Sequence, residues 1–478
     1  MYEFVGRDDE CRILQGALES PDAELIAVLG RRRVGKTFLI RTVYKTNMLF
    51  EFSGVHDASL QDQLFNFSVA LGTVTGNIRR SSVPGSWMEA FVFLEEYLAP
   101  IVKEKKSVIF FDEFPWIQTH RSGFLSAFGH FWNTWASRQQ NLVVVICGSA
   151  ASWMIRHIVN NRGGLHNRIT RRIRLLPFNL NETEEYLQSR KVNLDRYQIL
   201  QLYMALGGIP QYLKNIKPGE SAAQAIDRLC FTKDGGLIDE FRNLYQSLFD
   251  NAENHIAIIK ALAAKGMGLT RTEAIQQSGL SSGGTTSRLF EELAESGFIT
   301  AYIPLDKKVN DSIYKLTDEY SLFYLKFIQK ARTKGPGTWL KLTSTHSWKS
   351  WSGFAFEGIC FKHAPQIKKA LGISGVLTSE SVWRYKPRGE EQGTQIDLLI
   401  DRTDHCINIC EMKFAQSEVI IDKAYAENLR QKENVFRERT RLRKTLFLTM
   451  VTTYGVRKND YYVGLVVNEV KMDALFEK

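Results

Sequence analysis

The segment that most constrains the fold of this chain is residues 25–44, where an apolar run meets a glycine-containing turn and then a helical pattern. The apolar residues from Leu25 to Leu29 predict a buried strand, and the residues from Phe38 to Tyr44 predict a helix. Between them, residues 30–37 match the pattern G-x-x-x-x-G-K-[ST] without a mismatch. A strand that passes into a helix through such a turn predicts an α/β fold built on a parallel sheet.

The turn has the chemistry of a phosphate-binding loop. Its glycines allow backbone N–H groups to point inward around a polyphosphate, Lys36 reaches the β- and γ-phosphates, and Thr37 offers a hydroxyl to Mg²⁺. The N-terminus of the following helix adds its dipole to the anion site. We therefore predict that ATP and Mg²⁺ bind to the loop Gly30, Arg31, Arg32, Arg33, Val34, Gly35, Lys36 and Thr37. Cradling a phosphate does not require the three arginines, which we interpret as a contact to another subunit or to DNA.

A second apolar run ends in the acidic pair that a nucleotide site needs. Ser107 to Phe111 predict a buried strand that delivers Asp112 to the Mg²⁺ and Glu113 to the attacking water. An acidic pair alone is weak support, but this pair follows the phosphate-binding loop by about 75 residues. We therefore predict that Asp112 is a metal ligand and that Glu113 is the catalytic base.

Two other segments of the N-terminal half each have two interpretations. Residues 142–148 predict a buried strand, after which Ser149 either touches the γ-phosphate and orders the water or caps the next helix. Residues 4–10, Phe-Val-Gly-Arg-Asp-Asp-Glu, either fold over the adenine or use Asp8 or Asp9 to cap the first helix.

Length and composition narrow the class of protein. A chain of 478 residues predicts about three domains, and its hydrophobic content of 44% and charged content of 24% are ordinary for a folded protein. No apolar run approaches the roughly 20 residues that a membrane-spanning helix needs, and the first ten residues do not resemble a signal peptide. The six cysteines lack zinc-binding spacing, so we expect reduced thiols in the cytoplasm. The net charge of +10 permits nucleic-acid binding without requiring it.

Residues 251–320 predict three helices and a two-stranded wing, which is the pattern of a winged helix. Five residues at the start of its recognition helix and in its wing are predicted to contact DNA: Thr285, Thr286, Arg288, Lys307 and Lys308. Glutamates at positions 291, 292 and 295 place negative charge beside this surface. The alternative is therefore that this unit packs against other domains or docks a partner.

A pair of strands near the C-terminus carries carboxylates. Asp397 lies in the first strand, and Glu411 and Lys413 lie in the second, where residues two apart share a face. Two carboxylates that hold Mg²⁺ beside a lysine predict metal-assisted hydrolysis of a phosphodiester. Glu357, on a helix predicted over residues 354–371, would be a further ligand. The alternatives are an inactive site and a surface ion pair.

The motifs of the N-terminal half together resemble those of the archaeal-type ATPases, a branch near the border of the AAA+ and STAND groups and related to origin-recognition ATPases. The resemblance covers roughly residues 1–245 and rests on GRRRVGKT, VIFFDE, ICGSA, NRITRRIRLLPF and the turn Gly207-Gly208-Ile209-Pro210. It implies an AAA+-like parallel-sheet core with a helical lid, and assembly into a homo-oligomeric ring, for which we favour a hexamer. The lid shows no clear sensor arginine, because the Gly-Gly-Ile-Pro turn stands where other lids place one.

In ring ATPases, an arginine just before the last core strand reaches the γ-phosphate bound by the neighbouring subunit. Residues 167–175 alternate basic and apolar side chains, which predicts a strand with one basic face. Arg168 is the first candidate for this arginine by its position, and Arg171 is the second. The alternative is a solvated basic face.

The C-terminal segment resembles the PD-(D/E)xK nuclease fold, through Asp397, then Glu411-Met412-Lys413, preceded by the helical Glu357. Ile396 stands where the family pattern has proline, a position that often varies in the family. The resemblance implies a C-terminal α/β restriction-endonuclease-like domain of αβββαβ order, and domains of this kind are attached to archaeal-type ATPases. The predicted division is 1–180 for the ATPase core, 181–250 for the lid, 251–320 for the winged helix, 321–350 for a linker helix and boundary, and 351–478 for the nuclease-like domain.

The combination predicts an ATPase that hydrolyses ATP and controls Mg²⁺-dependent cleavage of nucleic acid, with DNA favoured. Lys432, on the helix after the two strands, is expected to meet phosphate. By analogy, such a pairing suggests a role in defence or in mobile elements. The alternative is a STAND-like signalling or scaffold ATPase whose C-terminal domains bind partners without cutting.

Overall fold

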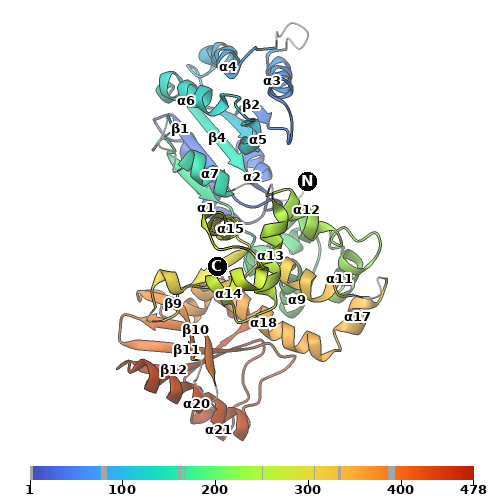
Figure 1. Ribbon diagram of the computed structural model, residues 1–478, viewed down its shortest axis with the longest axis vertical. Helices are drawn as coiled ribbons and strands as arrows, with labels where there is room; N and C mark the ends of the chain where they lie inside the picture. The colour runs from blue at the N-terminus through green and yellow to red at the C-terminus, as the bar shows by residue number, and fades with distance from the viewer. Residues whose placement is uncertain are drawn as a thin grey trace.

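A computed structural model describes residues 4–76, 83–149, 151–159, 164–165, 167–249, 251–305, 307–331, 335–385 and 393–478. Within these residues the chain forms three sheets. The molecule is elongated, with the N-terminal sheet at one end, the C-terminal sheet at the other and mostly helical segments between them (Figure 1).

The N-terminal sheet is parallel throughout, and its strand order is β2-β3-β4-β1-β5. Its strands are β1 (Glu24–Leu29), β2 (Met48–Ser53), β3 (Ser107–Asp112), β4 (Leu142–Gly148) and β5 (Arg171–Arg174). Every residue of β1, β3 and β4 is buried, because apolar clusters cover both faces of the sheet. The predicted parallel α/β core is confirmed.

Helices surround this sheet: α1 (Asp8–Leu18), α2 (Lys36–Val43), α3 (Leu60–Thr75), α4 (Trp87–Ile101), α5 (Phe114–Ile117), α6 (Phe124–Thr134), the 3-10 turn η1 (Ala136–Arg138), α7 (Ala151–Met154) and the π-helix η2 (Ile155–Val159). The N-cap of α1 is Arg7, whose side chain makes no capping hydrogen bond. The interpretation that Asp8 or Asp9 caps this helix is therefore wrong. Both aspartates lie in the first turn, where they interact favourably with the positive end of the helix dipole.

The predicted lid forms five helices: α8 (Leu180–Ser189), α9 (Arg196–Leu206), α10 (Pro210–Leu213), α11 (Ala222–Phe231) and α12 (Glu240–Gln246). The Gly-Gly-Ile-Pro turn joins α9 to α10. Gly207 has a φ of 65°, and a Cβ on Gly208 would lie 1.9 Å from the carbonyl oxygen of Phe178. The N–H of Phe178 donates to the carbonyl of Gly208 at 2.7 Å. The second glycine is therefore required by close contact between the lid and the segment after β5.

Residues 251–320, called the middle unit below, contain α13 (Ala252–Ala263), β6 (Leu269–Thr270), α14 (Arg271–Ser278), α15 (Gly284–Glu295), β7 (Ile299–Tyr302), η3 (Val309–Asp311) and β8 (Ile313–Leu316). The strands pair antiparallel in the order β6-β8-β7. All three predicted helices and both predicted strands are present, and β6 is additional. The unit lies between the two larger sheets, and α15 packs against α7 (Figure 1).

Five helical segments follow: α16 (Glu319–Phe323), the π-helix η4 (Tyr324–Ile328), α17 (Thr338–Leu342), α18 (His346–Lys362) and α19 (Ala364–Ala370). The helix predicted over residues 354–371 is divided at His363, because Pro365 has no N–H to continue the hydrogen-bond pattern. α18 also begins before the predicted domain boundary at residue 351. Its Trp348 packs against Trp339, with ring centroids 5.1 Å apart, so α18 joins the C-terminal part to the helices before it.

The C-terminal sheet is mixed, with the order β13-β12-β11-β10-β9. Its strands are β9 (Thr378–Tyr385), β10 (Thr394–Arg402), β11 (Cys406–Lys413), β12 (Thr445–Thr452) and β13 (Asn468–Lys471), with α20 (Lys423–Thr440), α21 (Asp460–Val463) and the 3-10 helix η5 (Met472–Phe476). β10 pairs antiparallel with both β9 and β11, whereas β11, β12 and β13 are parallel. α18 packs against β11 and α20 against β10, and they belong to different apolar clusters.

Candidate functional site

A cavity of about 490 Å³ lies at the carboxyl end of β1. The phosphate-binding loop, the N-terminal segment and the lid all contribute to its wall, with Arg32 to Phe38 from the loop, Phe4, Val5 and Arg7 from the N-terminus, and Pro210, Gln211 and Lys214 from the lid. Its volume is in the range of sites that hold one small molecule. The predicted loop therefore opens into a space suited to a nucleotide.

The polar side chains of Lys36 and Thr37 in the loop are held by hydrogen bonds to neighbouring groups. Lys36 is buried, and its Nζ donates to the carbonyl oxygens of Gly30 at 2.8 Å and Arg31 at 2.9 Å. The hydroxyl of Thr37 donates to Oδ2 of Asp112 at 2.8 Å. Burial raises the pKa of Asp112 above its ordinary value. A hydroxyl and a carboxylate are the oxygen donors that Mg²⁺ prefers, so these two residues fit the predicted ion.

Glu113 and Ser149 lie together because β3 and β4 are neighbouring parallel strands. The hydroxyl of Ser149 donates to Oε2 of Glu113 at 2.8 Å, and its backbone N–H donates to the same oxygen at 3.3 Å. Glu113 itself has a left-handed φ of 45°. Such backbone strain gathers at functional sites. These contacts favour the interpretation that Ser149 belongs to the nucleotide site.

The N-terminal segment covers one side of the cavity. The ring of Phe4 stacks on that of Phe38, with centroids 5.9 Å apart, and the guanidinium of Arg7 lies 4.4 Å from the ring centroid of Phe178. Arg7 also donates to the carbonyl oxygen of Val34 at 3.4 Å. This arrangement favours the interpretation in which residues 4–10 close over the base of a nucleotide.

A second group of ionisable side chains lies on α18 and on the strands β10 and β11 of the C-terminal sheet. The register that pairs Leu398 with Cys410 makes Asp397 and Glu411 neighbours on adjacent strands. The pairing of β10 with β9 is irregular between Ile396 and Leu399, so Asp397 lies at a bulge. Nζ of Lys413 lies 3.1 Å from Oε1 of Glu411.

Glu357 approaches the same group from α18. Burial, and after it the negative charge of Asp397, raises the pKa of Glu357 to about 8. Glu411 also raises this pKa, whereas Lys315 and Lys413 lower it. The four predicted residues, Glu357, Asp397, Glu411 and Lys413, are therefore electrostatic neighbours.

Two residues of α20, outside the four predicted residues of this site, form hydrogen bonds with Glu411. Lys432 donates to its Oε2 at 2.8 Å and the hydroxyl of Tyr425 donates to its Oε1 at 3.0 Å. Burial raises the pKa of Glu411, but Lys432 and Lys413 more than offset this and leave it below its ordinary value. Tyr425 and Lys432 are seven residues apart, which places both side chains on one face of a helix. This spacing is the sequence feature that could have indicated that they act together. Lys432 was expected to meet phosphate and instead pairs with the carboxylate.

The donor types fit a hard cation such as Mg²⁺, because three carboxylates can supply oxygen ligands. Within the part of the chain that the structure describes, however, no three His, Cys, Asp or Glu side chains are grouped closely enough to hold a metal ion. Glu411 points instead to Lys413 and Lys432.

Comparisons with known proteins agree with the first site. Residues 4–216 match a family model described as an ATPase domain predominantly from Archaea. We call this part of the chain the ATPase domain, after the family model that it matches. Over 401 residues, 83% of this chain and 84% of the relative, the chain is 24% identical to the uncharacterized protein MJECL04 of Methanocaldococcus jannaschii.

Solved structures that the comparison finds similar to this chain include the Walker-type ATPase PABY2304 of Pyrococcus abyssi and the ORC2 protein of Aeropyrum pernix. The first is 18% identical with a TM-score of 0.47, covering 67% of this chain and 96% of that chain. The second is 14% identical with a TM-score of 0.39, covering 71% of this chain and 94% of that chain.

Among the described residues, no helix combines the length and apolar character needed to cross a membrane.

The three arginines in the loop of the ATPase domain make internal contacts. Arg31 is 3% exposed and forms an ion pair with the equally buried Asp318. Arg32 lies over the ring of Trp116, 4.6 Å from its centroid. Arg33 forms an ion pair of 2.7 Å with Glu240 in the lid. The side chain of Arg31 turns into the protein, so the expected exposed contact of this side chain to DNA or to another subunit is wrong. The contact of its backbone with a nucleotide stays a prediction.

The two arginines considered as contacts to a neighbouring subunit differ in their surroundings. Arg168 is exposed and precedes the amino end of β5, whereas the phosphate-binding loop follows the carboxyl end of the parallel neighbour β1. Arg168 therefore does not line the cavity of its own ATPase domain. Arg171 forms an ion pair of 2.9 Å with Glu24 and donates to the carbonyls of Ile13 and Gly16. These contacts make Arg171 a structural residue, and Arg168 remains the prediction.

The predicted DNA-contacting residues are divided between surface and interior. Thr285, Lys307 and Lys308 are exposed. Thr286 is buried and its hydroxyl donates to the carbonyl of Ser281 at 2.6 Å, so its predicted side-chain contact with DNA is wrong in this structure. Arg288 is exposed but forms an ion pair of 2.7 Å with Glu292 on its own helix.

The C-terminal half of α15 contacts the ATPase domain. Arg174 donates to the carbonyls of Ala294 and Glu295 at 3.1 and 3.0 Å. Arg156 lies 4.0 Å from Glu292. Packing against another domain, which was the alternative for the middle unit, is thus observed for this face.

Proposed function

We propose that this chain is an ATPase in which ATP binding and hydrolysis control a Mg²⁺-dependent nuclease site that acts on DNA. The observation that carries the nuclease part is the juxtaposition of Glu357, Asp397, Glu411 and Lys413, which come from α18, β10 and β11. Separate elements bring these residues together at one end of the C-terminal sheet. An isolated surface ion pair would not account for the third carboxyl, that of the half-buried Glu357.

Glu357, Asp397 and Glu411 are the residues that would hold Mg²⁺. Bound there, the ion would polarise a phosphodiester and lower the pKa of a water molecule. Lys413, whose side chain is 43% exposed, is the group that can meet the negative charge that develops on the phosphate. Asp397 raises the pKa of Glu357, and a bound cation would offset this effect and favour the ionised form of Glu357.

In the ATPase domain, Thr37 and Asp112 would hold a second Mg²⁺, and Glu113, oriented by Ser149, would act on the attacking water. We expect the middle unit to act as a winged helix, with Thr285, Lys307 and Lys308 as its exposed contacts to DNA. A role in defence or in mobile elements is part of the same proposal.

We further propose a homo-oligomeric ring, a hexamer by preference, in which Arg168 completes the nucleotide site of the next subunit. Its exposed position outside its own cavity supports this role. Sizing the protein with and without ATP, beside Arg168→Ala, tests it. A monomer in both conditions would contradict the proposal.

The nuclease site is tested by incubating the protein with plasmid DNA and Mg²⁺. We expect cutting by the wild type and at least about a hundredfold loss in Asp397→Ala and in Lys413→Ala. Lys444→Ala is a matched control, because Lys444 also pairs with a carboxylate of β10, that of Asp401, but outside the proposed site. Equal residual cutting in the wild type and both site variants would overturn the proposal.

The second candidate is a STAND-like ATPase whose C-terminal domains bind partners without cutting. The contacts of Glu411 with Lys432 and Tyr425 favour it, because they occupy a carboxylate that a metal ion would need. Absence of cutting with Mg²⁺ or Mn²⁺, both with and without ATP, would select this candidate.

A further inference from the structure

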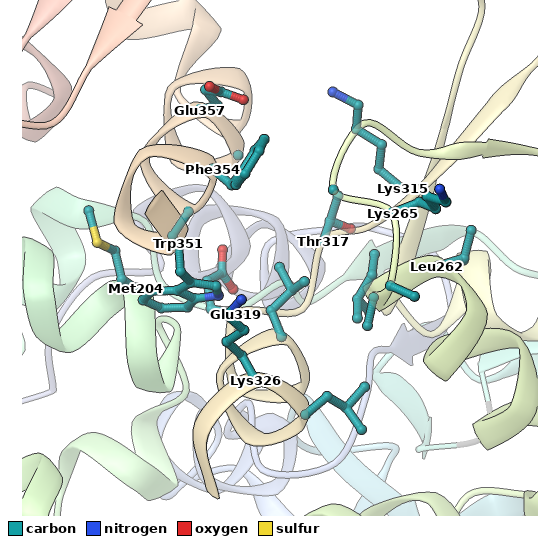
Figure 2. A pocket seen from close by; sticks show the side chains of 18 of the residues that line it. Met204, Leu262, Lys265, Lys315, Thr317, Glu319, Lys326, Trp351, Phe354 and Glu357 are labelled. Carbon is teal, nitrogen blue, oxygen red and sulfur yellow. The ribbon is translucent and has the colours of Figure 1, made fainter. Parts of the chain in front are cut away.

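A second cavity, of about 460 Å³, lies where the middle unit meets α18. Figure 2 shows Phe354 and Glu357 on one wall, from α18, and Lys265 and Lys315 of the middle unit on the facing wall. Asp397 of β10 also lines it. The cavity therefore leads from the middle unit to two of the carboxyls in the proposed nuclease site.

The lining of this cavity is rich in positive charge. Five lysines contribute to it: Lys260, Lys265, Lys315, Lys326 and Lys330. Across the described ranges, none of the five forms an ion pair with a carboxylate, although Lys315 is near enough to Glu357 to lower its pKa. Among the acidic residues of the lining, Glu319 is already paired with Lys362. The cavity thus offers ammonium groups that no carboxylate neutralises, although Nζ of Lys315 also lies 5.8 Å from the ring centroid of Tyr302. Ammonium groups arranged in this way can bind the phosphates of a nucleic-acid strand.

An aromatic side chain accompanies these charges. Phe354 is 48% exposed, and it precedes Glu357 by one turn of α18, so both lie on one helix face. A Cβ on Gly266 would lie 3.3 Å from its ring, which shows that Phe354 reaches across to the turn before β6. An exposed ring between lysines can stack on a nucleobase of any sequence.

We propose that this cavity binds a single strand of nucleic acid, with phosphates on Lys265 and Lys315 and a base on Phe354. The strand then enters the carboxylate site along the seam between the middle unit and α18. The role of the bound strand as a substrate rests on the proposed nuclease function. The binding of the strand in the cavity does not depend on that function. A space of this volume holds one or two nucleotides and cannot enclose a duplex.

The test is fluorescence anisotropy with a labelled single-stranded oligonucleotide, in EDTA so that nothing is cut. We expect the affinity to fall about tenfold in Lys265→Ala/Lys315→Ala and about tenfold in Phe354→Ala. The slope of log affinity against log salt should decrease by about 1.4 in the double lysine variant, because each phosphate contact to a single strand contributes about 0.7. Lys265→Arg/Lys315→Arg should restore binding.

Lys341→Ala/Lys349→Ala is the matched control, because these two exposed lysines lie on α17 and α18 but do not line the cavity. It should bind the single strand within twofold of the wild type. A fluorescent ATP analogue, bound equally by all variants, shows that they are folded. Unchanged single-strand binding in the cavity variants, or a larger loss in the control, would overturn the proposal. An unlabelled duplex that competes as well as the single strand would overturn the choice of a single strand.

The two proposals fail separately. If Asp397→Ala abolishes cutting while the cavity variants bind the strand normally, the nuclease function stands and the cavity inference falls. If the wild type cuts nothing but the cavity variants lose the strand, the cavity inference stands and the nuclease function falls.

Discussion

Arg31 of the phosphate-binding loop and Asp318, 287 residues later, form an ion pair in which each side chain is only 3% exposed. The guanidinium also lies 4.6 Å from the ring centroid of Phe298. Asp318 in turn caps α16 by accepting from the N–H of Ser321 at 2.9 Å. The next residue, Glu319, is paired with Lys362 at the end of α18, the helix that carries Glu357. Two adjacent residues therefore connect the nucleotide loop to the helix of the proposed nuclease site.

Asp318→Asn should destabilise the protein by about 3–5 kcal/mol, because it leaves the charge of Arg31 buried without its partner while the capping oxygen remains. The free energy of unfolding in urea, measured at pH 7, checks this. Asp9→Asn is the control, since the ion pair of Asp9 with Arg12 is 82% and 77% exposed and should contribute less than about 1 kcal/mol. Equal, small effects of the two substitutions would show that the buried pair is not important for stability.

Glu113→Gln should bind ATP normally and hydrolyse it about 10²–10⁴-fold more slowly, because the amide cannot accept a proton from water. Ser149→Ala removes a hydrogen bond to the same carboxylate and should slow hydrolysis about tenfold or more with little effect on KM. Steady-state phosphate release is the measurement. Glu51→Gln, on the neighbouring strand β2, should leave the rate unchanged. If Glu113→Gln hydrolysed ATP at the wild-type rate, its role as the base would be disproved.

Gly208→Ala should destabilise the lid by more than about 2 kcal/mol, because the added Cβ would overlap the carbonyl of Phe178. Gly353→Ala is the matched substitution, since Gly353 lies inside α18 with no atom within 4 Å of the added Cβ. It should stabilise the protein by about 0.5–1 kcal/mol. Thermal unfolding of the two variants should therefore shift in opposite directions.

The raised pKa of Glu357 makes stability depend on pH. The unfolded side chain has a pKa of about 4.3, and the folded one about 8. Between these values the unfolded chain has released a proton that the folded chain retains, so the free energy of unfolding falls as pH rises. Glu357→Gln removes this decrease in the free energy of unfolding. The variant should be more stable than the wild type by a few kcal/mol at pH 8, but not at pH 4.

Urea unfolding in EDTA at several pH values between 4 and 8 measures this difference. Glu433→Gln, which removes the carboxylate partner of the exposed Arg437, should follow the wild type throughout. A difference between Glu357→Gln and the wild type that does not change with pH would contradict the assignment.

Lys432→Met should raise the pKa of Glu411, because the charge of Lys432 lowers this pKa more than the charge of Lys413 does. If Glu411 must be ionised for cutting, the acid limb of the pH–rate profile should then move to higher pH. Arg437→Met, on the same helix, should leave the profile in place. An unmoved acid limb in Lys432→Met would mean that Glu411 does not control it.

Much of the site was readable from short stretches of sequence. The strand, glycine turn and helix around Lys36 are formed as predicted, and β3 and β4 bring Asp112, Glu113 and Ser149 to the same edge. The hairpin with Asp397, Glu411 and Lys413 also has the predicted pairing. Each of these features depends on apolar periodicity or turn geometry within a few residues, and such features are encoded locally.

The remaining features depend on which distant surfaces meet. The sequence alone determined a phosphate loop, an acidic strand end and a carboxylate-bearing hairpin, because backbone sterics and side-chain alternation act over a few residues. Only the tertiary structure decided that Arg31 pairs with Asp318, that α15 faces the ATPase domain, that Lys432 holds Glu411 and that five lysines share one cavity. Ion pairs and cavities between residues far apart in the chain leave no local pattern, since they result from the packing of complete elements.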